Sequence, residues 1–133
     1  MIEDIERGQV LNLPVHGERI VFGFGWTPAD GGEPLDFDLS AVLLTKAGEV
    51  VDCVYHRCLS AKGFCVRHMG DERGGACHPT EDDEQIAVYP AMVPESVQSI
   101  YFVASASNKA GQDYGFQKPE KTHFSVTCFD PAR

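Results

Sequence analysis

The stretch DFDLSAVLLT, residues 36–45, has the alternation that decides the fold. Apolar side chains stand at every second position, namely Phe37, Leu39, Ala41 and Leu43. Asp36, Asp38, Ser40 and Val42 stand between them. Because successive side chains of a strand point to opposite faces, this pattern predicts a β-strand with one buried face. The stretch ERIVFGFGW, residues 18–26, repeats the pattern with Ile20, Phe22, Phe24 and Trp26.

Further β-rich stretches occupy residues 49–56, 85–90, 98–107 and 122–129, and glycine-rich or polar turns separate them. No stretch carries an apolar stripe of helical period over three turns. The sequence therefore predicts an all-β protein, an antiparallel β-sandwich of two packed sheets. Its 133 residues predict a single domain, 1–133. Gly23 and Gly25 inside a strand predict a bulge or a close backbone approach.

The composition is acidic, with 20 Asp and Glu against 11 Lys and Arg and a formal net charge of −9. This balance argues against binding to nucleic acid or to an anionic membrane, because both need a basic face. No apolar run is long enough for membrane insertion. The acidic N-terminus has no apolar run typical of a secretory signal, and five cysteines are an odd count. We therefore expect a cytoplasmic protein with reduced thiols.

Two acidic clusters are the strongest candidates for chemistry. Asp36, Asp38 and Ser40 share one face of the predicted strand. The second cluster lies among glycines, and its members are Asp71, Glu72, Glu81, Asp82, Asp83 and Glu84. Many hard oxygen donors on flexible turns are what Ca²⁺ prefers, although neither cluster has the pattern of an EF-hand loop. Taken singly, each cluster is also explained as a solvated acidic turn, and cation binding requires the two to meet in space.

Thiols and imidazoles within residues 56–78 give an alternative. They are His56, Cys58, Cys65, His68, Cys77 and His78, and a mixed set of this kind could form a structural zinc site. Their spacing contains no second tight pair of the sort that zinc knuckles have. No nucleophile, base and orienting group follow from the spacing either, so we expect no catalytic residues and no enzymatic activity.

The motifs occur in a characteristic order along nearly the whole chain. They are Gly25-Trp26, Asp36-Phe37-Asp38-Leu39, Val54-Tyr55, His68-x-Gly70-Asp71, Asp82-Asp83-Glu84-Gln85-Ile86 and Val93-Pro94. In this order the chain resembles the TerD domain of tellurium-resistance and general stress proteins. Residues 5–13 are similar to the N-terminal strand of that family.

The resemblance implies a β-sandwich whose acidic loops at one end bind Ca²⁺, without established enzymatic activity. By position, the metal ligands that it implies are Asp36, Asp38, Asp71, Asp82, Asp83 and Glu84. Ser40, Glu72 and Gly74 depart from the family pattern, and residues 75–82 form a longer loop. These departures favour one bound Ca²⁺ over two.

The chain also ends earlier than the family's domain normally does. A sandwich without its last strands has an exposed sheet edge, so we expect a homodimer or strand exchange through that edge. The function implied is that of a calcium-binding module, acting as a binding or scaffold protein in a cytoplasmic stress-response system. The alternatives that remain are a structural zinc module and a metal-free interaction domain.

Overall fold

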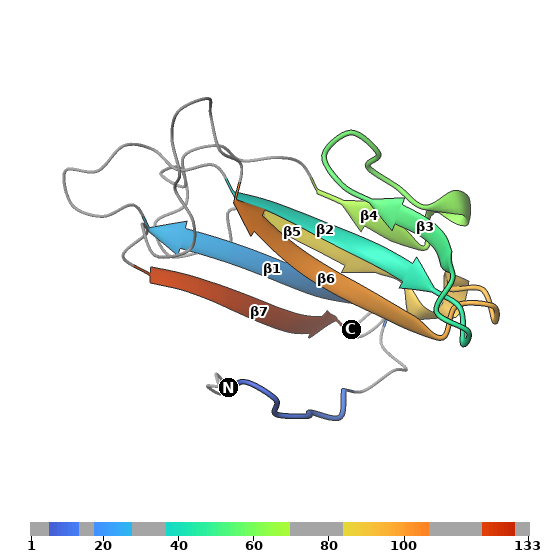
Figure 1. The fold of residues 1–133 in the computed structure, drawn as a ribbon, viewed down its shortest axis with the longest axis horizontal. Helices are drawn as coiled ribbons and strands as arrows, with labels where there is room; N and C mark the ends of the chain where they lie inside the picture. The colour runs from blue at the N-terminus through green and yellow to red at the C-terminus, as the bar shows by residue number, and fades with distance from the viewer. Residues whose placement is uncertain (1–5, 14–17, 28–36, 70–83, 107–120, 130–133) are drawn as a thin grey trace.

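The protein is a sandwich of two antiparallel sheets (Figure 1). The structure, a computed structural model, describes residues 6–13, 18–27, 37–69, 84–106 and 121–129. The first sheet has the order β4 (Val66–His68), β5 (Glu84–Val88), β1 (Arg19–Thr27) and β7 (Lys121–Phe129). The second has the order β3 (Val50–Val54), β2 (Phe37–Leu44) and β6 (Ser99–Ala106). The predicted all-β, antiparallel sandwich is confirmed.

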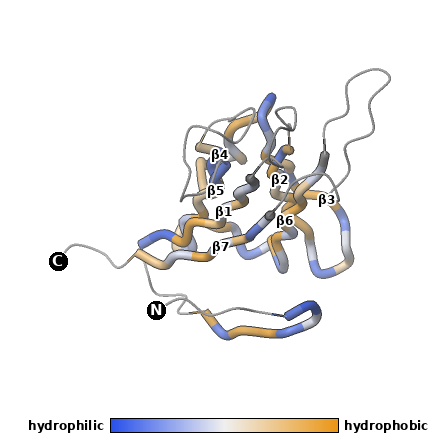
Figure 2. The backbone as a smooth tube through the Cα atoms, turned by 90° about the vertical axis from the view of Figure 1, so that its left-hand side faces the viewer, coloured by the Kyte–Doolittle hydropathy of each residue, from blue (hydrophilic) through white to orange (hydrophobic). Residues whose placement is uncertain are grey.

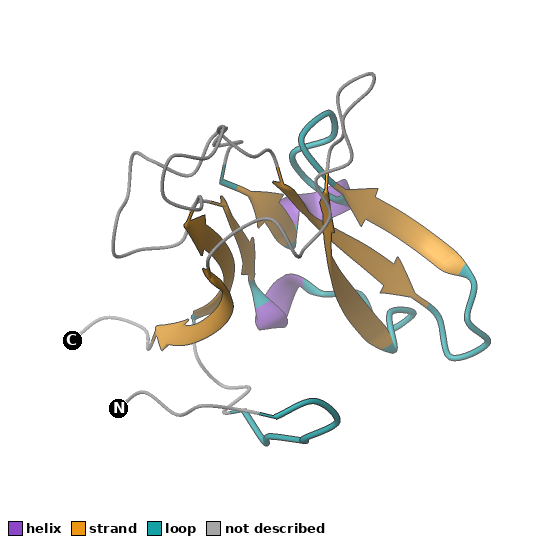
Figure 3. Cartoon of the chain, turned by 60° about the vertical axis from the view of Figure 1, so that its left-hand side comes forward, coloured by secondary structure: helices purple, strands orange, loops and turns teal. Residues whose placement is uncertain are grey.

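Helical structure is limited to two short 3₁₀ turns within the described ranges, η1 (Lys62–Phe64) and η2 (Pro90–Met92) (Figure 3). Over those same ranges, no helix has the length and apolar character needed to cross a bilayer.

The core lies between the sheets and follows the alternation of β1 and β2. On β2 the apolar positions are fully buried, and on β1 Phe24 and Trp26 are 2% and 3% exposed. The Phe37 ring packs edge-on against both, with ring centroids 6.0 Å from Phe24 and 5.4 Å from Trp26. Burial of each such large side chain contributes about 1.5–3 kcal/mol, so this aromatic group is a major source of stability.

Gly25 does not mark a bulge, so that prediction was wrong. β1 keeps a continuous register with β7 from Arg19 to Thr27, and its pairing with β5 is regular as well. His123 on β7 stands opposite Gly25, and its imidazole ring occupies the space that a side chain at position 25 would need. The glycine therefore allows a close approach by a neighbouring side chain rather than by backbone.

The expected N-terminal strand is also absent from the described part of residues 5–13. Residues 6–13 form a turn followed by an irregular stretch, and Gln9 N donates a hydrogen bond of 3.0 Å to Glu6 O. Gly8 has a φ of 85°, a conformation that favours glycine. This stretch lies apart from both sheets in Figures 1 and 2, and Val10 is 85% exposed. The strand expected here from the family resemblance is therefore not formed by residues 6–13.

Candidate metal centre

Asp38 lies at the start of β2, on the face of that strand turned away from the core. The burial of β2 alternates strictly, so Asp38 and Ser40 share this face as predicted. Asp38 stands opposite Ser105 of β6 in the register. Its side chain is 18% exposed, which leaves carboxylate oxygens accessible at this end of the sandwich.

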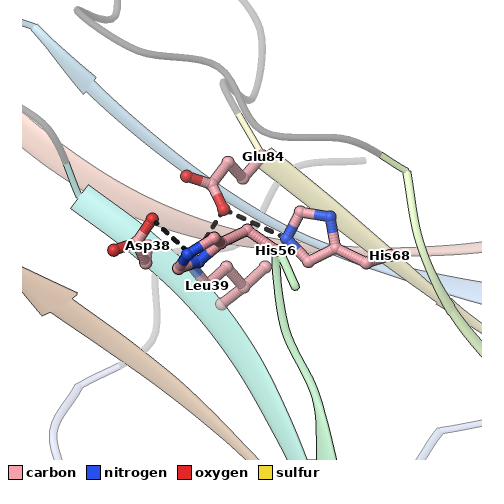
Figure 4. Close-up of polar contacts among 5 residues, drawn as sticks. All are labelled: Asp38, Leu39, His56, His68 and Glu84. Atoms are coloured by element: carbon pink, nitrogen blue, oxygen red, sulfur yellow. Dashed lines mark hydrogen bonds and ion pairs between the residues drawn. The ribbon is translucent and has the colours of Figure 1, made fainter. Parts of the chain in front are cut away.

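Glu84 is the first residue of β5, and its side chain is completely buried. Its Oε1 accepts a hydrogen bond of 3.0 Å from the backbone N–H of Leu39 in the opposite sheet. The Nε2 atom of His68 lies 3.1 Å from the same oxygen (Figure 4). Burying a carboxyl group is costly unless the group is hydrogen-bonded, and these two contacts of Oε1 offset part of that cost.

These contacts join the two acidic segments of the sequence. Leu39 follows Asp38 directly, and Glu84 ends the acidic run that begins at Asp71. His68 is the last residue of β4, so it and Glu84 stand at the two sides of the base of the 69–83 segment. The structure thus places the start of β2 beside Glu84, the residue that ends the acidic run.

His56 is a second imidazole beside the acidic residues. It follows β3 in a turn where Tyr55 and Cys58 form an isolated antiparallel bridge. Its Nδ1 lies 3.7 Å from Asp38 Oδ1, and its side chain is 35% exposed. When protonated, His56 forms an ion pair with Asp38 and partly neutralises it.

The other four predicted ligands lie outside the described residues. They are Asp36, Asp71, Asp82 and Asp83. Among the residues that are described, no three His, Cys, Asp or Glu side chains come close enough to hold a metal ion. The described donors, Asp38 and Glu84, are both carboxyl groups, and this donor chemistry fits a hard cation such as Ca²⁺.

The thiols of the zinc alternative are placed differently. Cys65 is 1% exposed and belongs to the hydrophobic core between the sheets. Burial raises the pKa of the Cys65 thiol above its usual 9.0, which disfavours the thiolate that zinc requires. The Cys58 Sγ atom lies 3.7 Å from the carbonyl oxygen of Ser60. Cys77 and His78 lie outside the described residues.

Sequence reasoning placed Glu84 correctly among the acidic residues but missed its contacts. It grouped His68 with the zinc alternative and gave it no carboxylate partner. Their positions could have suggested the contact between them, since His68 ends one β-rich segment and Glu84 begins the next. Nothing in the sequence indicates the hydrogen bond between Leu39 N–H and Glu84, because this bond depends on how the two sheets stack.

The fold and the acidic end together define a class: a β-sandwich with a candidate cation site at one end. The family follows from comparison with known proteins. The model of the TerD domain matches residues 1–128, so the chain belongs to the TerD domain family. The resemblance seen in the motifs is confirmed.

Two relatives share 28% sequence identity with the chain. One is the tellurium resistance protein TerZ of Serratia marcescens, matched over 98 residues, 66% of this chain and 50% of TerZ. The other is flagellar radial spoke protein 1 of Chlamydomonas reinhardtii, matched over 124 residues, 89% of this chain and 15% of that protein. The chain thus spans half of TerZ and a small part of the spoke protein.

Solved structures agree on the fold. A homologue of the telluride resistance protein TerD, SCO6318 from Streptomyces coelicolor A3(2), superposes with a TM-score of 0.67 at 15% identity. The match covers 82% of this chain and 64% of that one. SAV2460, a protein of unknown function, superposes with a TM-score of 0.70 at 12% identity and covers 84% of this chain and 66% of its own.

Proposed function

We propose that this protein is a calcium-binding module in which Ca²⁺ is held between the start of β2 and the acidic segment that ends at Glu84. The observation that supports the proposal is the hydrogen bond from Leu39 N to Glu84 Oε1, because it joins the start of β2 to the residue that ends the acidic run. Carboxylates gathered in this way repel one another, and a divalent cation relieves the repulsion.

The residues have different roles in this proposal. Asp38, whose carboxylate is partly exposed, is a direct ligand. Asp36, Asp71, Asp82 and Asp83 complete the oxygen shell. Glu84 Oε1 already accepts from Leu39 N and contacts His68, so Glu84 chiefly fixes the base of the site. With Ser40 in place of a further carboxylate, one Ca²⁺ is expected per chain.

The module acts as a binding or scaffold protein rather than as an enzyme, in a cytoplasmic stress-response system of the tellurium-resistance type. Membership of the TerD family and the 28% identity to TerZ support this assignment. Ordering of the acidic segment by Ca²⁺ would provide the surface that a protein partner binds.

Isothermal titration of EDTA-treated protein with Ca²⁺, Mg²⁺ and Zn²⁺ tests the proposal. We expect one Ca²⁺ per chain, weaker binding of Mg²⁺, and stabilisation by about 2–4 kcal/mol at a Ca²⁺ concentration 100 to 1,000 times the Kd. Asp38→Asn should weaken Ca²⁺ binding at least tenfold. Asp52→Asn, on β3, makes the same change of charge away from the start of β2 and should leave binding unchanged.

Two results would favour the alternatives. Zinc that survives dialysis and is lost in Cys58→Ser would support the structural zinc module. No heat of binding, with a melting curve identical in Ca²⁺ and in EDTA, would support a metal-free interaction domain.

A further inference from the structure

The inner face of β7 is apolar but uncovered. Phe124 and Val126 stand opposite Phe24 and Phe22 of β1, and directly paired residues of antiparallel strands point to the same side of the sheet. The Phe24 and Phe124 rings are in contact, with centroids 4.9 Å apart. Yet Phe124 is 51% exposed and Val126 is 42% exposed, whereas Phe24 is 2% exposed.

The cause is a difference in strand number between the two sheets. Phe22 of β1 stacks on Phe102 of β6 at a centroid distance of 3.9 Å, so β6 lies over β1. β6 is the last strand of its sheet in the described part of the chain, whereas β7 extends one strand further in the other sheet. One strand position, beside β6 and over β7, is left without a described strand; we call it the strand slot.

The same aromatic pair, Phe22 and Phe102, also lines an apolar hollow. It has a volume of about 360 Å³ and is lined mainly by apolar side chains of β1, β5, β6 and the segment before β6. Among them are Ile20, Phe22, Val88, Val97, Ile100 and Phe102. The slot itself offers an edge of β6 without a described partner strand and an apolar floor formed by Phe124 and Val126, the two features by which proteins bind an added β-strand.

A second folded sandwich cannot occupy the slot through its own β6. Antiparallel pairing of β6 with β6 of another copy puts the two-fold axis perpendicular to the sheet, so both four-stranded sheets lie on the same side. The position beneath the second β6 is already taken by its own β1, through the Phe22–Phe102 stack. β7 of the first copy would have to enter that same position. The occupant must therefore be an extended segment with no sheet beneath it.

The chain carries such a segment, residues 9–13, with the sequence QVLNL. Leu11 and Leu13 stand two positions apart and would share one face of a strand. In the structure the segment belongs to no strand and lies apart from the sandwich, with Val10 85% and Leu11 42% exposed. Within one chain, apolar side chains of both the segment and the slot are thus exposed.

We propose that two copies of this chain exchange these segments, so that residues 9–13 of each copy add as a strand beside β6 in the slot of the other. Leu11 and Leu13 then cover Phe124 and Val126. Each copy donates one segment and receives one, so the assembly is a closed dimer with two identical junctions. The inference refines the expected homodimer or strand exchange, since it names the exchanged segment and the slot that receives it, and it does not depend on Ca²⁺.

Light scattering coupled to gel filtration, over a range of protein concentrations and in EDTA, tests the exchange. We expect a mass of twice the 14.6 kDa of one chain. Leu11→Asp with Leu13→Asp should give monomers, whereas Asn12→Asp, on the opposite face of the segment, should leave the dimer intact. In the slot, Val126→Asp should give monomers, and its neighbour Thr127→Asp, which faces outward, should not.

Mixing provides the decisive measurement. A segment-defective chain still has an intact slot, and a slot-defective chain still has an intact segment. Each variant alone should be monomeric, and an equimolar mixture of the two should form dimers with one sound junction. Circular dichroism matching that of the unaltered protein identifies the variants that have folded; Val126→Ser replaces Val126→Asp if the latter unfolds.

A monomer at every concentration would overturn the proposal, and so would a dimer that survives the Leu11 and Leu13 changes. A monomer that loses stability when Leu13 is changed would show that the segment folds back onto its own chain, which also overturns it.

Discussion

The two long sides of the sandwich are built from similar sequence patterns but end in different states. On the side of β3 and β4 the inward residues are sealed, with Val54, Val66 and Ile86 completely buried. On the side of β6 and β7 the inward residues Phe124 and Val126 are about half exposed. The register is continuous from β5 through β1 to β7, so an irregular strand does not account for the exposure of Phe124 and Val126. Whether an inward-facing residue is buried therefore depends on whether a strand of the other sheet covers it, and the sequence of one strand does not reveal this.

The closed side depends on a buried polar contact, so the largest effect is expected there. Glu84→Ala should lower the free energy of unfolding by about 3–5 kcal/mol in EDTA, because it leaves His68 and the Leu39 N–H buried without their acceptor. Glu84→Gln, which keeps a carbonyl acceptor, should lose less. Urea unfolding followed by tryptophan fluorescence measures both. Equal losses for the two variants would show that packing, not the hydrogen bonds, matters at this position.

Two phenylalanines in contact across β1 and β7 make the comparison directly. Phe24→Ala should cost about 3–5 kcal/mol, since it empties a fully enclosed site. Phe124→Ala should cost about 1 kcal/mol at low protein concentration, because half of its side chain is already in water. Chemical unfolding at several protein concentrations sharpens the test. If strand exchange covers Phe124, the stability lost in Phe124→Ala, relative to the unaltered protein, should increase with protein concentration. The stability lost in Phe24→Ala should stay the same.

The smallest expected effect concerns pH and again belongs to the closed side. Burial raises the pKa of Cys65 in the folded protein above 9.0. As the pH rises past 9, the unfolded thiol releases its proton while the folded thiol keeps it, so the unfolded state binds fewer protons and stability falls. Cys65→Ala should make the decline of stability between pH 8 and 10 less steep, even though it lowers stability at pH 7. An unchanged slope in urea-unfolding series across this range would assign the decline to other groups.

Much of the fold could be predicted from the sequence, because β2 alternates strictly in burial and β1 buries Ile20, Phe24 and Trp26 as expected. The family, too, was accessible, since its motifs are spread in order over the whole chain. The N-terminal stretch was expected to be a strand from the family resemblance, and residues 6–13 are not one, because similarity in sequence does not by itself supply a neighbouring strand with which to pair. Gly25 was assigned to a bulge because its true neighbour, His123, is almost a hundred residues away in the sequence.

The sequence indicated which type of ligand the candidate site contains, but not how the residues are arranged. Carboxylates on a strand and among glycines pointed to a cation, and the contact between Leu39 and Glu84 agrees with a shared site. Which carboxyl group is buried, and against which backbone N–H, depends on the stacking of two sheets. Single-strand patterns contain no information about that stacking, so Glu84 was grouped with exposed ligands although it is fully enclosed.

The contacts at the base of the 69–83 segment bear on how this region can change. Met69 N donates to Gln85 O at 2.8 Å, and the His68–Glu84 contact closes the same base from within. The sandwich fixes the two ends of this segment, so a change in its length alters the entropy of closing the chain between them. That entropy changes slowly with length, by about 0.6 kcal/mol for each doubling. We therefore expect residues inserted between Gly75 and Asp82 to change the free energy of unfolding little, while the contacts at the base stay as they are.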